Sequence, residues 1–304
     1  MKKIIAMLLV LVMSVTGLVG CGSSKDNEAG STSASSDSDW AYIQDKGKLT
    51  VGITLFAPMN YYNEKNKLVG FDTEMAEAVT KKLGIDVEFT EINWDSKEVE
   101  LSSKNIDCIW NGFTMNGRED DYTFSDPYVD NSQVIVVAED SGIEKLTDLA
   151  GKTVGVQAAS AALDLLQSEE DGGQKELADT FGALNEFADY NTAFTELQAG
   201  ALDALAIDVG VAKYQLNSRG EGFKILDETL NTEQYAIGFK KGNTELCDIV
   251  NADLQKLADD GTVAELAEKY EIADMVTLKA SDDASAEDSK DATDDAETDK
   301  TEEK

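Results

Sequence analysis

Short apolar runs alternate with amphipathic stretches through the middle of the chain. The runs are rich in β-branched and other apolar residues and have polar flanks, a pattern typical of buried strands. The predicted strands cover residues 49–53, 87–90, 106–110, 134–138, 153–157, 204–207 and 235–239. The run at 134–138 has no polar residue, which favours a buried parallel strand or a crossover.

Helix signals fill the intervals between these strands. Apolar residues at helical spacing predict a helix from 71 to 83, with Asp72 or Thr73 as its N-cap and Gly84 as its C-cap. Further helices are predicted at 161–167, before 200, and around 246–257 and 263–270. Alternating strands and helices indicate an α/β fold with helices on both faces of a sheet. Because ligands of such sheets bind beyond the carboxyl ends of the strands, the turns that follow strands are the places to search for function.

Both ends of the chain differ from this pattern. Residues 1–21 combine two early lysines, a short apolar stretch and small residues before Cys21, which predicts a secretory signal. A single N-terminal membrane anchor is the alternative, although the apolar stretch is shorter than a bilayer requires. Residues 22–39 have almost no apolar side chains and are predicted to be a flexible tether. Residues 281–304 are predicted to be a disordered acidic tail.

Composition excludes several classes of function. The formal net charge is -34, which argues against binding to nucleic acid or to an anionic membrane surface. The chain has no histidine, so Ser-His-Asp triads, histidine zinc ligands and histidine general bases are all excluded. We expect no cofactor. Of the three cysteines, Cys108 and Cys247 are predicted as either two buried thiols or one disulfide.

Three turns after predicted strands carry polar residues that suit a zwitterion. Arg118, in the first turn, is one of two arginines in the chain, and its guanidinium matches a carboxylate bidentately. Ser160 ends the second turn at a predicted helix start, where small residues and the helix dipole favour an anion. Asp208 ends an apolar strand and is a suitable partner for an ammonium group.

Each of these residues also has a purely structural interpretation. Arg118 can form a surface ion pair with Asp120 or Asp121. Ser160 and Asp208 can each be an ordinary helix N-cap. Taken singly, the residues leave these alternatives open.

Several strings in fixed order resemble the family 3 extracellular solute-binding proteins of amino-acid ABC importers. The resemblance covers about residues 47–275 and rests on strings at 70–72, 105–107, 124–128, 149–156, 200–204 and 260–262. It implies a two-domain periplasmic-binding-protein fold of type II, with a ligand cleft between domains that a two-strand hinge joins. Domain 1 would comprise residues 40–136 plus 235–280, and domain 2 residues 137–234, with the hinge strands near Val136 and Gln234.

The resemblance also implies roles for residues of this chain. Separately, Leu18-Val19-Gly20-Cys21 resembles the lipobox of bacterial lipoproteins, which implies that Cys21 is acylated. The roles that the family resemblance implies concern the ligand: Arg118 for the carboxylate, Thr114 and Ser160 as hydroxyls, Asp208 and the Gly112 carbonyl for the ammonium, Phe56 and Trp94 as aromatic walls, and Asn111 facing the side chain. The chain departs from the family pattern at two places. The segment before Arg118 is one residue shorter than usual, and Ala159 stands where the family usually has a glycine.

The sequence thus predicts a lipid-anchored binding protein on the extracellular face of the cell membrane, or in the periplasm if the cell has an outer membrane. It would capture a neutral polar amino acid such as glutamine or cystine and deliver it, as a monomer, to an ABC transporter permease. A sensory lipoprotein without a transporter is one alternative. An enzyme is the other, because a few proteins with this fold are dehydratases, although no acid in the sequence has a visible catalytic partner.

Overall fold

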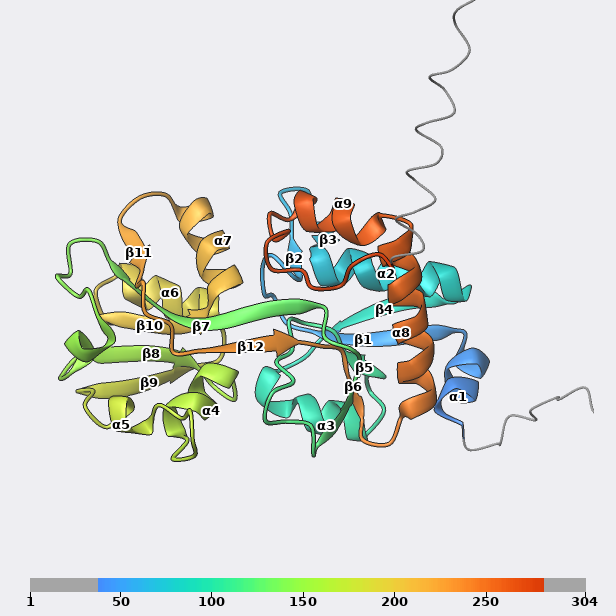
Figure 1. Ribbon diagram of the computed structural model, residues 1–304, viewed down its shortest axis with the longest axis horizontal. Coiled ribbons are helices and arrows are strands. Elements are labelled where there is room, and N and C mark those ends of the chain that lie inside the picture. Colours follow the sequence, from blue (N-terminus) through green and yellow to red (C-terminus); the bar gives the residue numbers. More distant parts are fainter. Residues whose placement is uncertain (1–37, 282–304) are drawn as a thin grey trace, which may run out of the picture. The chain divides into compact units, whose positions relative to one another are not determined.

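The computed structural model describes residues 38–281, which form two lobes, each with its own sheet (Figure 1). The predicted signal at 1–21, with Cys21, and nearly all of the predicted tether and acidic tail lie outside the described residues. Among the residues that the model describes, no helix has the length and apolar character needed to cross a membrane.

The first lobe contains a five-stranded sheet in the order β4-β1-β5-β13-β6. Its strands are β1 (Lys48–Ile53), β4 (Asp86–Glu91), β5 (Cys108–Ile109), β6 (Tyr122–Phe124) and β13 (Gly238–Lys240), and a small hairpin of β2 (Tyr61–Tyr62) and β3 (Leu68–Val69) lies beside it. β1 pairs in parallel with β4 and β5, whereas β13 pairs antiparallel with β5 and β6. The strand predicted at 106–110 is shorter than expected and covers only Cys108–Ile109. The N–H of residue 106 bonds to the Glu100 carbonyl instead of to a neighbouring strand.

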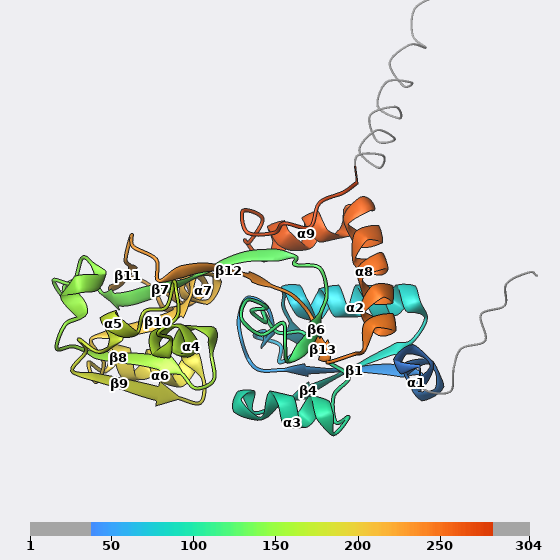
Figure 2. The same ribbon diagram turned by 60° about the horizontal axis from the view of Figure 1, so that its bottom comes forward.

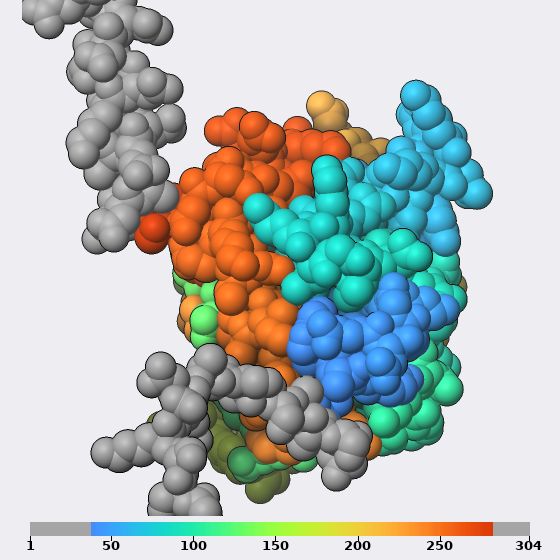
Figure 3. Space-filling view, turned by 90° about the vertical axis from the view of Figure 1, so that its right-hand side faces the viewer, coloured from blue at the N-terminus to red at the C-terminus, as the bar shows by residue number. Residues whose placement is uncertain are grey.

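Helices cover this sheet on both faces (Figure 2). They are α1 (Asp39–Lys46), α2 (Phe71–Leu83), η1 (Trp94–Ser96), α3 (Lys97–Ser102), α8 (Thr244–Asp259) and α9 (Thr262–Lys269). On the side of this lobe turned away from the second lobe, α1, α2 and α8 form one continuous surface (Figure 3), and the Leu246 N–H bonds to Asp39 there. Gly84 ends α2 with a φ of 70°, as predicted.

The N-cap prediction for α2 was wrong. The cap position is Gly70, and Asp72 and Thr73 both lie inside the helix and are buried. The Asp72 carboxylate accepts hydrogen bonds from the Gly112 N–H (2.6 Å) and the Tyr128 hydroxyl (2.8 Å) instead of capping its own helix. Tertiary contacts therefore override the local capping preference at this position.

The second lobe contains a six-stranded sheet. Its strands are β7 (Val129–Ala138), β8 (Thr153–Gln157), β9 (Ala183–Phe187), β10 (Ala204–Asp208), β11 (Phe223–Ile225) and β12 (Asn231–Tyr235). β8 is parallel to β9 and β10, but β7 is antiparallel to β10, β11 and β12. The interpretation of 134–138 as part of a buried parallel strand was wrong, because β7 is antiparallel to all three of its neighbours. The chain enters this lobe along β7 and leaves it along β12, which lies beside β7.

The remaining helices lie on the faces of this second sheet. They are η2 (Leu146–Leu149), α4 (Ala161–Gln167), α5 (Lys175–Ala178), α6 (Tyr190–Gln198) and α7 (Val209–Arg219). α4 has the predicted bounds because the Ser160 side chain caps it by accepting the Leu163 N–H at 3.1 Å. Asp208 occupies the cap position of α7, but its side chain makes no capping bond.

Two strands, β7 and β12, run side by side between the lobes (Figures 1 and 2). Their register places Glu233 opposite Asn131 and Tyr235 opposite Val129. The run predicted as one strand at 235–239 is broken, because the N–H groups of Ala236 and Ile237 bond to Phe113 and to the Ser125 hydroxyl. The fold class is confirmed as two-domain α/β, while the individual domain boundaries stay a prediction.

Candidate ligand-binding site

Residues of both lobes line one small cavity. The lining residues are Thr54, Phe56, Trp94, Asn111, Gly112, Thr114, Arg118, Gln157, Ser160, Ala161 and Asp208. The open space is about 20 Å³, whereas a single water molecule requires roughly 10–15 Å³. An amino acid does not fit into this space, so the lobes must separate for a ligand of that size to enter.

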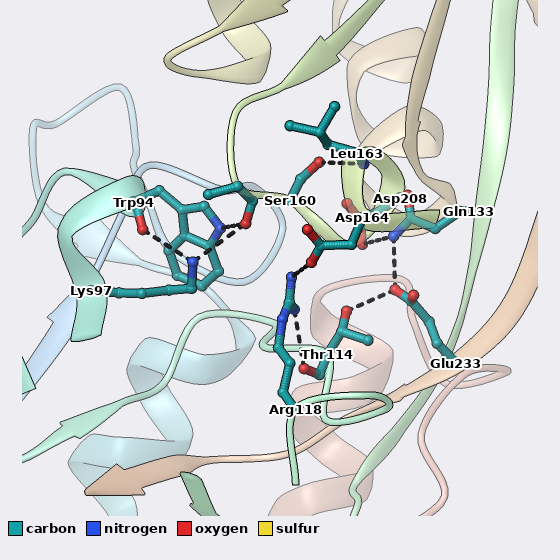
Figure 4. Close-up of polar contacts among 11 residues, drawn as sticks. Trp94, Lys97, Thr114, Arg118, Gln133, Ser160, Leu163, Asp164, Asp208 and Glu233 are labelled. Carbon is teal, nitrogen blue, oxygen red and sulfur yellow. Dashed lines mark hydrogen bonds and ion pairs between the residues drawn. The ribbon is translucent and has the colours of Figure 1, made fainter. Parts of the chain in front are cut away.

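Arg118 reaches the cavity through a tight turn. The Arg118 N–H bonds to the Met115 carbonyl (3.0 Å), and Gly117 between them has a φ of 77°. The shortened segment before the arginine therefore still directs it into the cavity. The guanidinium donates to the Thr114 carbonyl (3.2 Å) and, across the cleft, to Asp164 of α4 (2.7 Å; Figure 4).

The predicted structural alternative for Arg118, an ion pair with Asp120 or Asp121, was wrong. The Arg118 side chain is 12% exposed, and its partner Asp164 is 61% exposed. The arginine is thus largely buried, while the carboxylate that it contacts can turn out into solvent. This arrangement allows another carboxylate to replace Asp164.

Asp208 faces the cavity from the carboxyl end of β10 and belongs to a buried polar network. Its Oδ1 atom accepts hydrogen bonds from the Tyr235 hydroxyl (2.6 Å) and from the side-chain amides of Asn131 and Gln133 (both 2.8 Å). These partners explain why the carboxylate does not cap α7. Burial raises the pKa of the Asp208 carboxyl above its ordinary value.

A second carboxylate, Glu233 on β12, lies in the same network (Figure 4). Its Oε1 atom accepts hydrogen bonds from Asn131 (2.8 Å), Gln133 (2.7 Å) and the Thr114 hydroxyl (2.8 Å). Each of the two side-chain amides therefore gives one N–H to each carboxylate. Burial, and then the proximity of Asp208, raises the pKa of Glu233 to about 7.

Gly112 forms the floor of the cavity in a conformation that requires glycine. Its φ is 55°, and a Cβ there would come within 2.8 Å of Phe56 and 3.1 Å of Tyr235. Asp72 holds this residue by accepting its N–H, and burial raises the pKa of the Asp72 carboxyl to about 7. The Gly112 turn thus depends on a helix residue that is distant in sequence.

Contacts across the cleft converge on the Ala159 carbonyl of the second lobe. Trp94 Nε1 donates to it at 3.1 Å and Lys97 Nζ at 3.3 Å (Figure 4). Ala159 has a φ of 53°, the strained conformation that its replacement of a glycine implies. Burial, and then the charge of Arg118, lowers the pKa of Lys97 to about 8.

Aromatic and amide side chains form the rest of the wall. Phe56 and Trp94 are both nearly buried, at 7% and 8% exposure. Asn111 accepts the Thr54 N–H (2.8 Å) and donates to the Thr54 hydroxyl (2.8 Å), which leaves one of its amide hydrogens for a ligand. Gln157 lies on the opposite side of the cleft and donates to the Ala188 carbonyl.

The structure brings all eight residues that the sequence predicted for ligand binding to this one cavity. Sequence reasoning missed other polar residues that border or support the site, namely Thr54, Asp72, Lys97, Asn131, Gln133, Gln157, Asp164 and Glu233. No alternating pattern marked the pair at 131 and 133, because residues 130–133 of β7 are all polar. Cys108 and Cys247 are free and buried.

The chemistry of the cavity suits a zwitterion better than a metal. Its lining contains one cation, Arg118 of the first lobe, and one anion, Asp208 of the second lobe. In the described part of the chain, no group of histidine, cysteine, aspartate or glutamate residues is arranged to hold a metal ion.

Comparison with known proteins shows which family this chain resembles. The sequence pattern of the bacterial extracellular solute-binding proteins, family 3, matches residues 49–273. The chain is 32% identical to the L-cystine-binding protein TcyA of Bacillus subtilis strain 168, over 89% of this chain and 97% of that protein. It is 34% identical to the arginine-binding extracellular protein ArtP of the same strain, over 89% and 98%.

A solved structure shows the same relationship. An ABC uptake transporter substrate-binding protein from Streptococcus pneumoniae with bound histidine has a TM-score of 0.74 to this chain and is 32% identical to it. The match covers 80% of this chain and all of that structure, at 100%. The names of these three proteins specify three different amino acids, so similarity alone does not select a ligand.

Proposed function

Because the chain belongs to the bacterial extracellular solute-binding proteins of family 3, we propose that it captures a neutral polar amino acid and delivers it to an ABC importer. The observation that carries this proposal is that one largely buried arginine, Arg118, and one buried aspartate, Asp208, both line a cavity formed by residues of both lobes. An α-amino acid carries a carboxylate and an ammonium group, and these two side chains complement them.

Arg118 and Ser160 bind the ligand carboxylate in this proposal. The guanidinium exchanges its exposed partner Asp164 for the ligand, and a bidentate pair forms. The Ser160 oxygen already accepts the Leu163 N–H, so its own hydroxyl hydrogen is available to donate. The start of α4 adds a favourable dipole for the anion.

Asp208, the Gly112 carbonyl and the Thr114 oxygen bind the ammonium group. The Thr114 hydroxyl hydrogen is already donated to Glu233, so the Thr114 oxygen is left to accept. The sequence suggested Thr114 simply as a polar hydroxyl contact. The structure supports a more specific role, in which it accepts a hydrogen bond from the ammonium group.

The side-chain end of the cavity favours an uncharged ligand. Phe56 and Trp94 provide aromatic surface, and Asn111 and Gln157 provide amides. Arg118 and Asp208 are the only charged lining residues, and both are assigned to the backbone groups of the ligand. A side chain with a net positive or negative charge would find no opposite charge there, which favours glutamine, or cystine with its net-neutral second half, over arginine or glutamate.

Ligand entry and release then occur by a hinge motion about β7 and β12. Closure brings Trp94 and Lys97 onto the Ala159 carbonyl and excludes water from the ion pairs. Electrostatic contacts are stronger when water is excluded. The closed shape is also the feature that a permease can distinguish from the open one.

The N-terminal part of the proposal concerns attachment to the membrane. We propose that Cys21 is acylated after removal of residues 1–20, because two or more acyl chains make a stable anchor. The protein would then lie on the outer face of the cell membrane as a monomer. Mass spectrometry of the membrane fraction tests this, since Cys21→Ala should release the protein from the membrane.

A thermal-shift panel of the common amino acids and cystine tests the ligand class. A ligand that binds only the folded protein stabilises the protein by about 2.7 kcal/mol when the ligand concentration is a hundred times the dissociation constant. We expect one or two neutral polar amino acids to raise the melting temperature. A shift with only arginine or only glutamate would contradict the proposed ligand class.

Two other functions make different predictions. A sensor would bind the same ligand but would have no permease and ATPase encoded beside it. An enzyme would change its ligand, so recovery of the unaltered amino acid after prolonged incubation would exclude turnover.

A further inference from the structure

The two carboxylates of the buried network have no cationic partner within the structure. Asp208 is 5% exposed and Glu233 is 4% exposed. Among residues 38–281, no lysine or arginine forms an ion pair with either one. Two adjacent negative charges without a counterion are strongly disfavoured in a buried site, and such a site keeps a proton instead.

The hydrogen bonds show that the two groups act as a unit, here called the carboxylate pair. The side-chain amides of Asn131 and Gln133 each bridge Asp208 Oδ1 and Glu233 Oε1, at 2.7–2.8 Å. Both amides have thereby used all their N–H groups on the pair. The amide oxygens of Asn131 and Gln133 have no hydrogen-bond partner among the described residues.

The charged and titratable neighbours of the pair supply no compensating charge. Tyr235 of β12 donates to Asp208, and the hydroxyl of Tyr190 of α6 lies buried nearby, but both tyrosines are neutral at physiological pH. The cation in the cavity lining is Arg118, which is bonded to Asp164 of α4. The site therefore lacks one positive charge, and an ammonium group provides it.

We propose that the carboxylate pair of Asp208 and Glu233 holds one proton in the unliganded protein, and that the ammonium group of the amino acid displaces this proton to solvent on binding. Glu233 is then a positioning residue of the ammonium site. It orients the Thr114 hydroxyl as an acceptor and shares the proton with Asp208, although it does not itself line the cavity. This inference rests on the proposed function.

The raised pKa values agree with this geometry. Burial raises the pKa of both carboxyls, and that of Glu233 is about 7. Below that pH the unliganded pair is protonated, whereas the ammonium-bound pair is ionised. Binding therefore releases a proton, and the dissociation constant rises about tenfold for each pH unit below 7.

Isothermal titration calorimetry at pH 6 tests the proposal on the unmodified protein. L-glutamine and L-cystine are titrated in two buffers with different ionisation enthalpies, so that the heat difference gives the number of protons released. We expect close to one proton for each ligand bound. Measurable binding with fewer than about 0.2 protons released would overturn the proposal.

A glutamine at position 233 gives the second test. Glu233→Gln keeps an oxygen for the three hydrogen bonds but removes one negative charge, so Asp208 alone ionises at lower pH. We expect the dissociation constant of this variant to change less than threefold between pH 5.5 and 7.5, against more than tenfold for the wild type. A variant that keeps the wild-type pH dependence would overturn the role of Glu233.

Two controls separate the possible failures. Glu139→Gln changes an exposed glutamate just beyond the end of β7 and should keep the wild-type pH dependence and proton release. If neither probe nor any other amino acid binds at any pH, the proposed function fails. If binding occurs without proton release, only the carboxylate-pair inference fails.

Discussion

Replacing Asp164 with asparagine should strengthen amino-acid binding, whereas replacing Arg118 with alanine should weaken it severely. The two residues form one ion pair, with 2.7 Å between Arg118 Nη2 and Asp164 Oδ2. Opposite effects are expected because Asp164 occupies the guanidinium that the ligand carboxylate needs. If the pair were only a structural contact, both substitutions would act in the same direction.

The exposure of each partner sets the magnitudes. Asp164 is 61% exposed, so its ion pair is worth only about 0.2–1 kcal/mol. Removing this competition should therefore lower the dissociation constant by about 1.4- to 5-fold. Arg118 is 12% exposed, and its loss would leave the ligand carboxylate unpaired in the closed cleft. That costs about 2–5 kcal/mol, or roughly 30- to 5000-fold in affinity.

Calorimetric titration of both variants with L-glutamine and L-cystine gives the required constants. Asp179→Asn is a matched control, because Asp179 forms a similarly exposed ion pair with Lys175 on α5, and it should leave the affinity unchanged. Weaker binding by Asp164→Asn would show that the ion pair holds the ligand-bound state closed. A change of less than threefold in Arg118→Ala would refute the role of Arg118 as the carboxylate clamp.

Three further predictions concern other residues of the site. Trp94→Phe keeps an aromatic ring but removes the indole N–H and its 3.1 Å bond to the Ala159 carbonyl, so calorimetry should show about 2- to 12-fold weaker binding; an unchanged dissociation constant would exclude a role in closure. Ala159→Gly should raise the urea unfolding free energy by about 0.5–1 kcal/mol because its φ is 53°, whereas Ala78→Gly within α2 should lower it by about 1 kcal/mol. The pKa of Asp72 is raised to about 7, so its stabilising contribution is present below pH 4 and is lost as the pH rises through 7. Between pH 4 and 7 the wild type should therefore lose up to about 1.4 kcal/mol per pH unit more than Asp72→Asn, and equal slopes in urea unfolding would contradict this.

Local sequence signals predicted the elements that depend mainly on local contacts. The helix at 161–167 has its predicted bounds because Ser160 caps it. Gly84 ends α2 because only a residue tolerant of positive φ fits there. The cavity residues could be found because side chains at the carboxyl ends of neighbouring strands converge, and because strings shared with a known family located those turns.

The features that sequence reasoning missed depend on contacts between distant segments. Asp72 occupies a position typical of a helix cap, but its carboxylate bonds to Gly112 and Tyr128, and no local preference shows this. Lys97 and Asp164 resemble ordinary charged helix residues until the two lobes are brought together. Glu233 is one of many glutamates, and only its register against Asn131 on β7 reveals its pairing with Asp208.

The central claim is that Arg118 and Asp208 bind the carboxylate and the ammonium group of one amino acid. The most direct test is calorimetric comparison of the amino acid selected by the thermal-shift panel with two analogues, its α-carboxamide and its N-acetyl derivative. We expect each analogue to bind at least about 30-fold more weakly, because each lacks one of the two charges that the site complements. If either analogue binds as tightly as the parent amino acid, the group that it lacks is not recognised and the account of this site is wrong.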